Sequence, residues 1–345
     1  MAEVVDWEFA VATGRRFAPA GPEVSLREAR RIVADIARAS RTAIEPVAEL
    51  TGLIAPVDSH HAVVVGRPAW IRANISQLQF AMAPLTRKLK ERQPSVLAAE
   101  AGSRATALQM GTILAWLSGK VLGQYEAFTT DYGNGGRLLL VAPNIVAAER
   151  EMNVRPQDFR LWVCLHEETH RLQFTAVPWL SGHFTDSVHT YLSKTDDSGW
   201  HAFSRILRTL SESVRTGARP SLLDLAHTPE QREILDHLTA LMSLLEGHAD
   251  VVMDEVGPRV VPSVVAMRSR FDQRRAQPKG RDGVLRKVLG LDAKLRQYTH
   301  GAAFVRGVID QVGMAGFNVV WTSPETLPRS EEIADPGRWV RRVQP

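Results

Sequence analysis

Five consecutive residues, His166-Glu-Glu-Thr-His170, carry side chains that could do chemistry together. Residues four positions apart lie on the same face of an α-helix, so the two histidines can point their imidazoles at one site. Two neutral imidazoles placed in this way supply half of a tetrahedral zinc site. Glu167 can then lie beside a water at the metal and act as its base. The pattern predicts a zinc site; the alternative is that both histidines pack within an ordinary helix.

The residues around this motif predict a buried helix over positions 157–175. Pro156 suits a first helical position, and Asp158 favours the positive end of the helix dipole. Apolar side chains cover most of the circumference, which is typical of a helix enclosed by the rest of the protein. Cys164 lies on a different face from His166, and we interpret it as a small buried apolar residue and not as a ligand.

A third metal ligand must come from elsewhere in the chain. A helix predicted over residues 229–256 carries Glu246 and Asp250 on an apolar segment, where an unpaired carboxylate would be unfavourable. Glu246 is the preferred ligand, and Asp250 can accept the second ring proton of a ligand histidine. His248 and Asp250 remain rival ligands, although His248 points to the opposite side of the helix. Gly247, unusual within a helix, predicts a close approach to the motif helix.

The motifs His166-Glu-x-x-His170 and Glu246-x-x-Ala-Asp250 together resemble the gluzincin class of zinc metallopeptidases. From about residue 60 onward, the chain also resembles an actinobacterial family of zinc-dependent metallopeptidases that is associated with deazaflavin-coenzyme biosynthesis and has no established physiological role. The matching segments are Val64–Asn74, Val121–Glu126, Gly136–Asn144, Leu165–Phe174, Pro178–Leu180, Gln297–Phe304 and Trp321–Pro328. The resemblance implies a mostly helical protein with one zinc ion bound by His166, His170 and Glu246, and with Glu167 as catalytic base. It implies no substrate.

Composition narrows the class of protein. The chain of 345 residues is 44% apolar and 23% charged, as in globular proteins that fold in water. It has no apolar run of the roughly 20 residues that span a bilayer and no visible secretory signal, so we expect no membrane partner. A single cysteine agrees with a reducing cytoplasm, the expected location.

A modest net charge of +4 gives little reason to expect a nucleic-acid partner. Basic residues do cluster around the polar stretch 277–283, but no aromatic residues lie between them, so we interpret the stretch as a solvated linker. The members of this cluster are Arg274, Arg275, Lys279, Arg281, Arg286 and Lys287.

Periodicity predicts a mainly α fold, a large helical metallopeptidase-like architecture with a small β element beside the zinc helix. Further helices are expected near 25–45, 68–91, 97–125, 143–152 and 284–313, and short strands at Ala62–Val65, Arg137–Val141 and Asn318–Thr322. We divide the chain into an N-terminal helical part (1–135), a zinc-binding catalytic part (136–275) and a C-terminal helical part packing on the site (276–345), together one compact unit.

Two segments could contact a substrate. Arg137–Val141 is our candidate for an edge strand that holds an extended peptide by backbone pairing, with a buried strand as the equal alternative. Residues 176–228 show little regular pattern and could form a lid over the cleft.

Three classes of function remain open. The preferred one is a zinc-dependent hydrolase of peptide or amide bonds acting on a peptide or protein, with Tyr298, or secondly His300, stabilising the oxyanion. Tyr298 could equally be a buried packing residue. The second class is a catalytically silent zinc-stabilised scaffold that binds a peptide. The third is an anion or nucleic-acid binder in which zinc is structural.

Overall fold

The computed structural model describes residues 3–56, 62–90, 96–127, 136–194, 228–276 and 291–344, with backbone alone at 90, 96–99, 274–276 and 291–299. Its helices and strands are α1 (Trp7–Phe17), α2 (Leu26–Thr51), β1 (Val63–Val65), α3 (Arg67–Ala81), α4 (Ala83–Lys90), α5 (Val96–Leu117), β2 (Gly123–Glu126), β3 (Arg137–Val141), α6 (Ala142–Glu151), α7 (Pro156–Ala176), α8 (Leu180–Ser193), α10 (Pro229–Val260), α11 (Val264–Ala276), α13 (Leu291–Phe317), the 3-10 helices η1 (Asn318–Trp321) and η2 (Pro324–Thr326), α14 (Ser330–Ala334) and α15 (Pro336–Val343). None of these helices is both long enough and apolar enough to cross a membrane.

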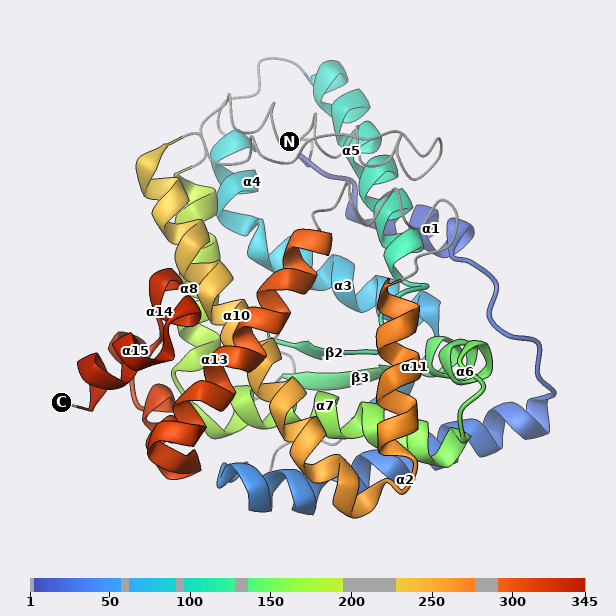
Figure 1. Cartoon of the computed structure of the whole chain (residues 1–345). Helices are drawn as coiled ribbons and strands as arrows, with labels where there is room; N and C mark the ends of the chain where they lie inside the picture. Colours follow the sequence, from blue (N-terminus) through green and yellow to red (C-terminus); the bar gives the residue numbers. More distant parts are fainter. Residues whose placement is uncertain are drawn as a thin grey trace.

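A small sheet with the strand order β1-β3-β2 separates two hydrophobic cores. β3 pairs parallel with β1 and antiparallel with β2. Because side chains alternate across a strand, Leu140 faces the larger core while Leu139 and Val141 face the smaller one. In Figure 1 the sheet lies between α7 on one side and α3 on the other.

The helix that carries the His166–His170 motif, α7, runs through the larger core. It packs against α2 and α10, and α13 packs on α10 in turn; Figure 1 shows α2 beneath α7, with α10 and α13 crossing in front. Phe159, Trp162 and Leu165 of α7 are almost completely buried. This burial explains why apolar residues cover most of the helix, and it holds the motif rigidly.

The predicted mainly α fold with a small β element beside the motif helix is confirmed. The helix predicted over 157–175 is α7, and that predicted over 229–256 is α10. The larger core takes residues from Ile32 to Trp339. The three-part division of the chain stays a prediction.

One helix boundary and one strand were wrongly predicted from the sequence. The helix expected over 97–125 ends at Leu117, because the Asn144 side-chain amide donates to the carbonyls of Ser118 (2.7 Å) and Val121 (2.6 Å) and fixes the turn that leads into β2. The strand expected at Asn318–Thr322 is the 3-10 helix η1. Its Asn318 amide donates to the carbonyl of Thr51, at the end of α2 (2.7 Å), so side-chain anchoring and not strand pairing sets its conformation.

Other boundaries differ from expectation because tertiary packing overrides local pattern. The helix expected over 68–91 breaks at Met82 into α3 and α4, and the helix expected over 25–45 continues through Pro46 to Thr51. The helix expected over 284–313 begins, within the described residues, at Leu291 and continues to Phe317. The segment 176–228, expected to be irregular, contains α8; its remainder, 195–227, lies outside the described residues.

Candidate metal centre

Two histidines and one glutamate from two distant helices meet beside the sheet. His166 and His170 lie on α7 and Glu246 lies on α10, and one ligand atom of each is within 4.8 Å of the others. The Nε2 atoms of the two histidines are 3.2 Å apart, and Glu246 Oε2 lies 3.6 Å from His166 Nε2 and 3.8 Å from His170 Nε2. Within the described residues, this is the one group of three such side chains that could hold a metal ion.

These spacings fit a tetrahedral cation. With metal–ligand bonds of about 2.1 Å, the donor atoms of a tetrahedral zinc site lie about 3.4 Å apart, close to the three distances observed. Two imidazole nitrogens that face each other at 3.2 Å also need a cation or a shared proton between them, since two lone pairs would repel. The side chains therefore fit a zinc ion held by two histidines and one carboxylate.

The three groups perturb one another's titration. Burial would lower the pKa of His170, but its interaction with the Glu246 carboxylate and the charge of Glu167 outweigh burial and raise that pKa to about 9. Burial would raise the pKa of Glu246, yet its interactions with both histidine rings hold it well below its usual value. The Glu246 carboxylate is thus held in its charged, metal-ligating form.

The two glutamates of the motif have different surroundings. Glu168 is almost fully buried and forms a two-point ion pair with Arg171, at 2.5 and 2.8 Å. Glu167 lies instead beneath β2, where a Cβ on Gly123 would be only 2.7 Å from both of its carboxylate oxygens. Burial raises the pKa of Glu167, although the charges of the neighbouring histidines oppose this shift. Glu167 is therefore the motif glutamate whose carboxylate interacts with the charges of His166, His170 and Glu246.

The residues behind the histidines support them differently. Nδ1 of His166 faces Asp250 Oδ1 at 3.8 Å, and Asp250 faces Arg268 Nη1 at the same distance. Nδ1 of His170 lies 2.9 Å from Oε1 of Gln173, a fully buried residue. The sequence analysis missed this role of Gln173. Its position one turn after His170 could have indicated it.

His248 lies away from the three converging side chains. Its ring is fully buried between Phe317 and Trp321, with centroid distances of 5.2 and 5.4 Å. Burial, with a smaller contribution from the charge of His170, lowers its pKa to about 3. This location is consistent with the helical-phase argument against His248 as the third ligand.

The predicted close approach at Gly247 exists, but its partner was wrongly predicted. A Cβ on Gly247 would lie 2.5 Å from the backbone nitrogen of Ala302 and from the carbonyl oxygen of Gly301, both on α13. The absence of side chains at Gly247 and Gly301 lets α10 and α13 touch. The glycine next to Glu246 therefore packs against α13 and not against α7.

The edge-strand candidate was also wrong, and the alternative of equal weight, a buried strand with no free edge, is confirmed. Arg137–Val141 is β3, the central strand of the sheet, and has a partner on each side. The strand beside Glu167 is β2, which the sequence analysis did not predict. Within the described residues, β2 pairs with β3 alone, and its other edge has no strand partner there.

Two further groups of predicted residues are incompletely described. The Tyr298 side chain lies outside the described residues, and His300 is exposed on α13. The side chains of the basic cluster around 277–283 also lie outside the described part of the chain.

The sequence pattern of a family described as zincin-like metallopeptidase matches residues 5–340. The chain belongs to the zincin-like metallopeptidase family. A crystal structure from Chloroflexus aurantiacus, described as a presumed hydrolase with a novel fold, is similar to this zincin-like protein, with 31% sequence identity, a TM-score of 0.68 and 98% of each chain covered. Among curated proteins, none matches the sequence.

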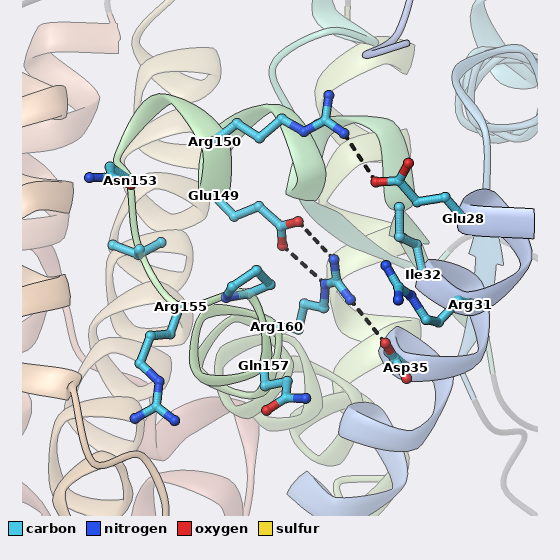
Figure 2. A pocket seen from close by; sticks show the side chains of 12 residues that line it. Glu28, Arg31, Ile32, Asp35, Glu149, Arg150, Asn153, Arg155, Gln157 and Arg160 are labelled. Atoms are coloured by element: carbon cyan, nitrogen blue, oxygen red, sulfur yellow. Dashed lines mark hydrogen bonds and ion pairs between the residues drawn. The ribbon is translucent and has the colours of Figure 1, made fainter. Parts of the chain in front are cut away.

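A charged pocket of about 550 Å³ lies away from the candidate metal centre, between α2, α6 and the start of α7 (Figure 2). At its centre the buried Arg160 of α7 forms a two-point ion pair with Glu149 of α6, at 2.7 and 3.0 Å, and reaches Asp35 of α2 at 3.3 Å. Arg150 and Glu28 form an exposed pair at 3.3 Å near its rim. These contacts tie the first turns of α7 in this zincin-like protein to two neighbouring helices.

Proposed function

We propose that this protein is a zinc-dependent hydrolase of peptide or amide bonds, with His166, His170 and Glu246 as ligands and Glu167 as general base. The observation that carries the proposal is the convergence of three donor atoms at spacings close to those of a tetrahedral site. Membership of a metallopeptidase family supports the same chemistry. A structural zinc site usually has four protein ligands, whereas the described residues here offer three.

The chain's own residues fit the steps of such a hydrolysis. A zinc ion at this site would supply a Lewis acid for the scissile carbonyl and lower the pKa of an attacking water to near 7. Glu167 would take the proton of that water and pass it to the leaving nitrogen. Among the described residues, no hydrogen bond engages the Glu167 carboxylate, so it is free to accept this proton. Asp250, 3.8 Å from Nδ1 of His166 and beyond direct hydrogen-bond length, would favour a proton on that nitrogen through its charge.

The open edge of β2 would hold the substrate backbone. Val141 donates to the Leu122 carbonyl at 2.8 Å, so alternate residues from Leu122 onward pair with β3. The backbone groups of Gly123 and Tyr125 therefore point to the open edge. An extended peptide pairing there would cross beside Glu167.

Tyr298 is our proposed donor to the oxyanion, with His300 second; this assignment rests on the sequence. The association with deazaflavin-coenzyme biosynthesis, the cytoplasmic location and a peptide or protein as natural substrate likewise rest on the sequence. They stay predictions.

Digestion of a peptide library by the zinc-loaded protein tests the proposal. We expect cleavage by the wild type, loss of at least about 100-fold in rate for Glu167→Gln with zinc content unchanged, and loss of zinc for Glu246→Ala. Equal cleavage by the wild type and Glu167→Gln would reject Glu167 as base. Zinc-loaded wild-type protein that binds peptides and cleaves none would instead support the silent scaffold.

A further inference from the structure

The amide of Gln173 forms three contacts whose chemistry fixes its orientation. Its Nε2 lies 2.9 Å from the carbonyl oxygen of Leu245, a group that can only accept a hydrogen bond. The amide nitrogen must therefore face α10, which turns the amide oxygen toward His170. Since an amide oxygen can only accept, Nδ1 of His170 must carry a proton at the 2.9 Å contact. This leaves Nε2 of His170 as the nitrogen that faces Glu246 and His166.

The second hydrogen of the same amide also has a partner. Nδ1 of His248 lies 3.0 Å from Nε2 of Gln173, so the neutral His248 ring accepts there. Phe317 and Trp321 pack against that ring, and the indole nitrogen of Trp179 donates to the carbonyl of Trp321 at 3.0 Å. The C-terminal part of α13 and η1 thus holds His248, which helps to hold the Gln173 amide.

We infer that Gln173 is a positioning residue for the metal centre: it selects the metal-facing nitrogen of His170 and couples that choice to the position of α10. Leu245, whose carbonyl it binds, directly precedes the ligand Glu246, so one amide connects a ligand on α7 with the segment that carries the ligand on α10. The inference rests on the proposed zinc site but does not require that the site hydrolyse anything.

Within the described residues, His166 has no equivalent hydrogen bond. The nearest acceptor to its Nδ1 that the structure shows is Asp250 at 3.8 Å, beyond hydrogen-bond length, whereas the Gln173 contact is 2.9 Å and buried. The two histidines of the motif therefore differ. The ring of His170 is fixed by a neutral amide that is itself doubly anchored, so a change at Gln173 should weaken the site even though it removes no ligand.

Zinc affinity, measured by competition with a chromophoric chelator on the full chain, tests this inference. Gln173→Met keeps a similar side-chain volume and removes all three polar contacts; we expect a 10- to 100-fold weaker affinity. The matched control is Gln157→Met, an exposed glutamine on the same helix, which should leave affinity within about two-fold. His248→Phe keeps the aromatic packing but removes one anchor of the amide, and should weaken zinc binding by a smaller factor of a few-fold.

A spectroscopic readout separates positioning from general loosening. In the cobalt(II)-substituted wild type, the Nδ1 proton of His170 should give a paramagnetically shifted NMR signal that exchanges slowly, because Gln173 shields it. Gln173→Met should lose that signal while remaining folded by circular dichroism. Unchanged zinc affinity and an unchanged signal in Gln173→Met would overturn the inference and leave the proposed hydrolase intact. Failure of the wild type to bind zinc would overturn both, and zinc binding without peptide cleavage would affect only the proposed function.

Discussion

Replacing Gly247 by alanine would test the contact that places Glu246. A Cβ at this position would lie 2.5 Å from two backbone atoms of α13, whereas real Cβ contacts shorter than 3.0 Å are essentially never seen. Backbone atoms cannot swing aside as the tip of a flexible side chain can. The substitution should therefore force α10 and α13 apart and destabilise the protein.

A second glycine provides a matched control and sets the magnitude. Gly182 lies inside α8, and a Cβ there would have no neighbour within 4 Å. Both substitutions gain the same helix propensity, about 1 kcal/mol for alanine over glycine, so this gain cancels when the two variants are compared. Overpacking costs about 1–3 kcal/mol, which is the difference in free energy of unfolding that we expect between them. Gly182→Ala should be at least as stable as the wild type.

Urea unfolding followed by far-UV circular dichroism would measure both variants, first without and then with saturating zinc. Because Gly247 adjoins Glu246, its variant should also gain less stability from zinc than Gly182→Ala does. If Gly247→Ala proves as stable as Gly182→Ala and binds zinc equally well, the close crossing of α10 and α13 does not position the ligand.

Three further predictions concern the ion pairs, pH and metal. Glu149→Gln should lower the free energy of unfolding, measured in urea, by about 3–5 kcal/mol, because it leaves the buried Arg160 without its two-point partner. Glu28→Gln, which changes an exposed pair, should lower it by about 1 kcal/mol or less. Equal losses in the two variants would contradict this reasoning. Burial lowers the pKa of both His183 and His237, although the charges of Asp186 and Glu325 oppose this shift at His183. Below pH about 6.5 the unfolded chain therefore binds more protons than the folded protein, and stability falls as the pH falls. His237→Gln should lessen the drop in Tm between pH 7.5 and 5.5, and an unchanged drop would contradict this reasoning. A chelator should lower the Tm of the zinc-loaded protein, and added zinc should restore it. At zinc concentrations 1,000 times Kd, binding should add about 4 kcal/mol to the free energy of unfolding. A Tm that does not respond to either treatment would contradict the proposed zinc site.

Much of the metal centre could be predicted because it depends on local spacing. His166 and His170 share a face through helix geometry alone, and the carboxylate of Glu246 stands out on an apolar helix. Which partner each group takes depends on tertiary contacts. The choice between Glu167 and Glu168 is set by Arg171, which pairs with Glu168, and by β2, which covers Glu167.

The elements that were wrongly predicted are those held by distant residues. β2 begins after a turn that the buried Asn144 fixes from the next part of the chain, and no local periodicity encodes such a contact. The strand expectation for Asn318–Thr322 failed because a short apolar run fits several conformations until a partner such as Thr51 selects one. The position of Arg137–Val141 in the middle of the sheet likewise depends on strands far away in the sequence.

The claim on which the account depends is that His166, His170 and Glu246 bind one zinc ion together. Zinc K-edge absorption spectroscopy with metal analysis, on the wild type and Glu246→Ala, tests it most directly. We predict about one zinc per chain in the wild type, with two nitrogen and at least one oxygen ligand near 2.0–2.2 Å, and loss of most of that zinc in Glu246→Ala. Wild-type protein that binds no zinc, or Glu246→Ala that retains a full equivalent with the same spectrum, would contradict the account.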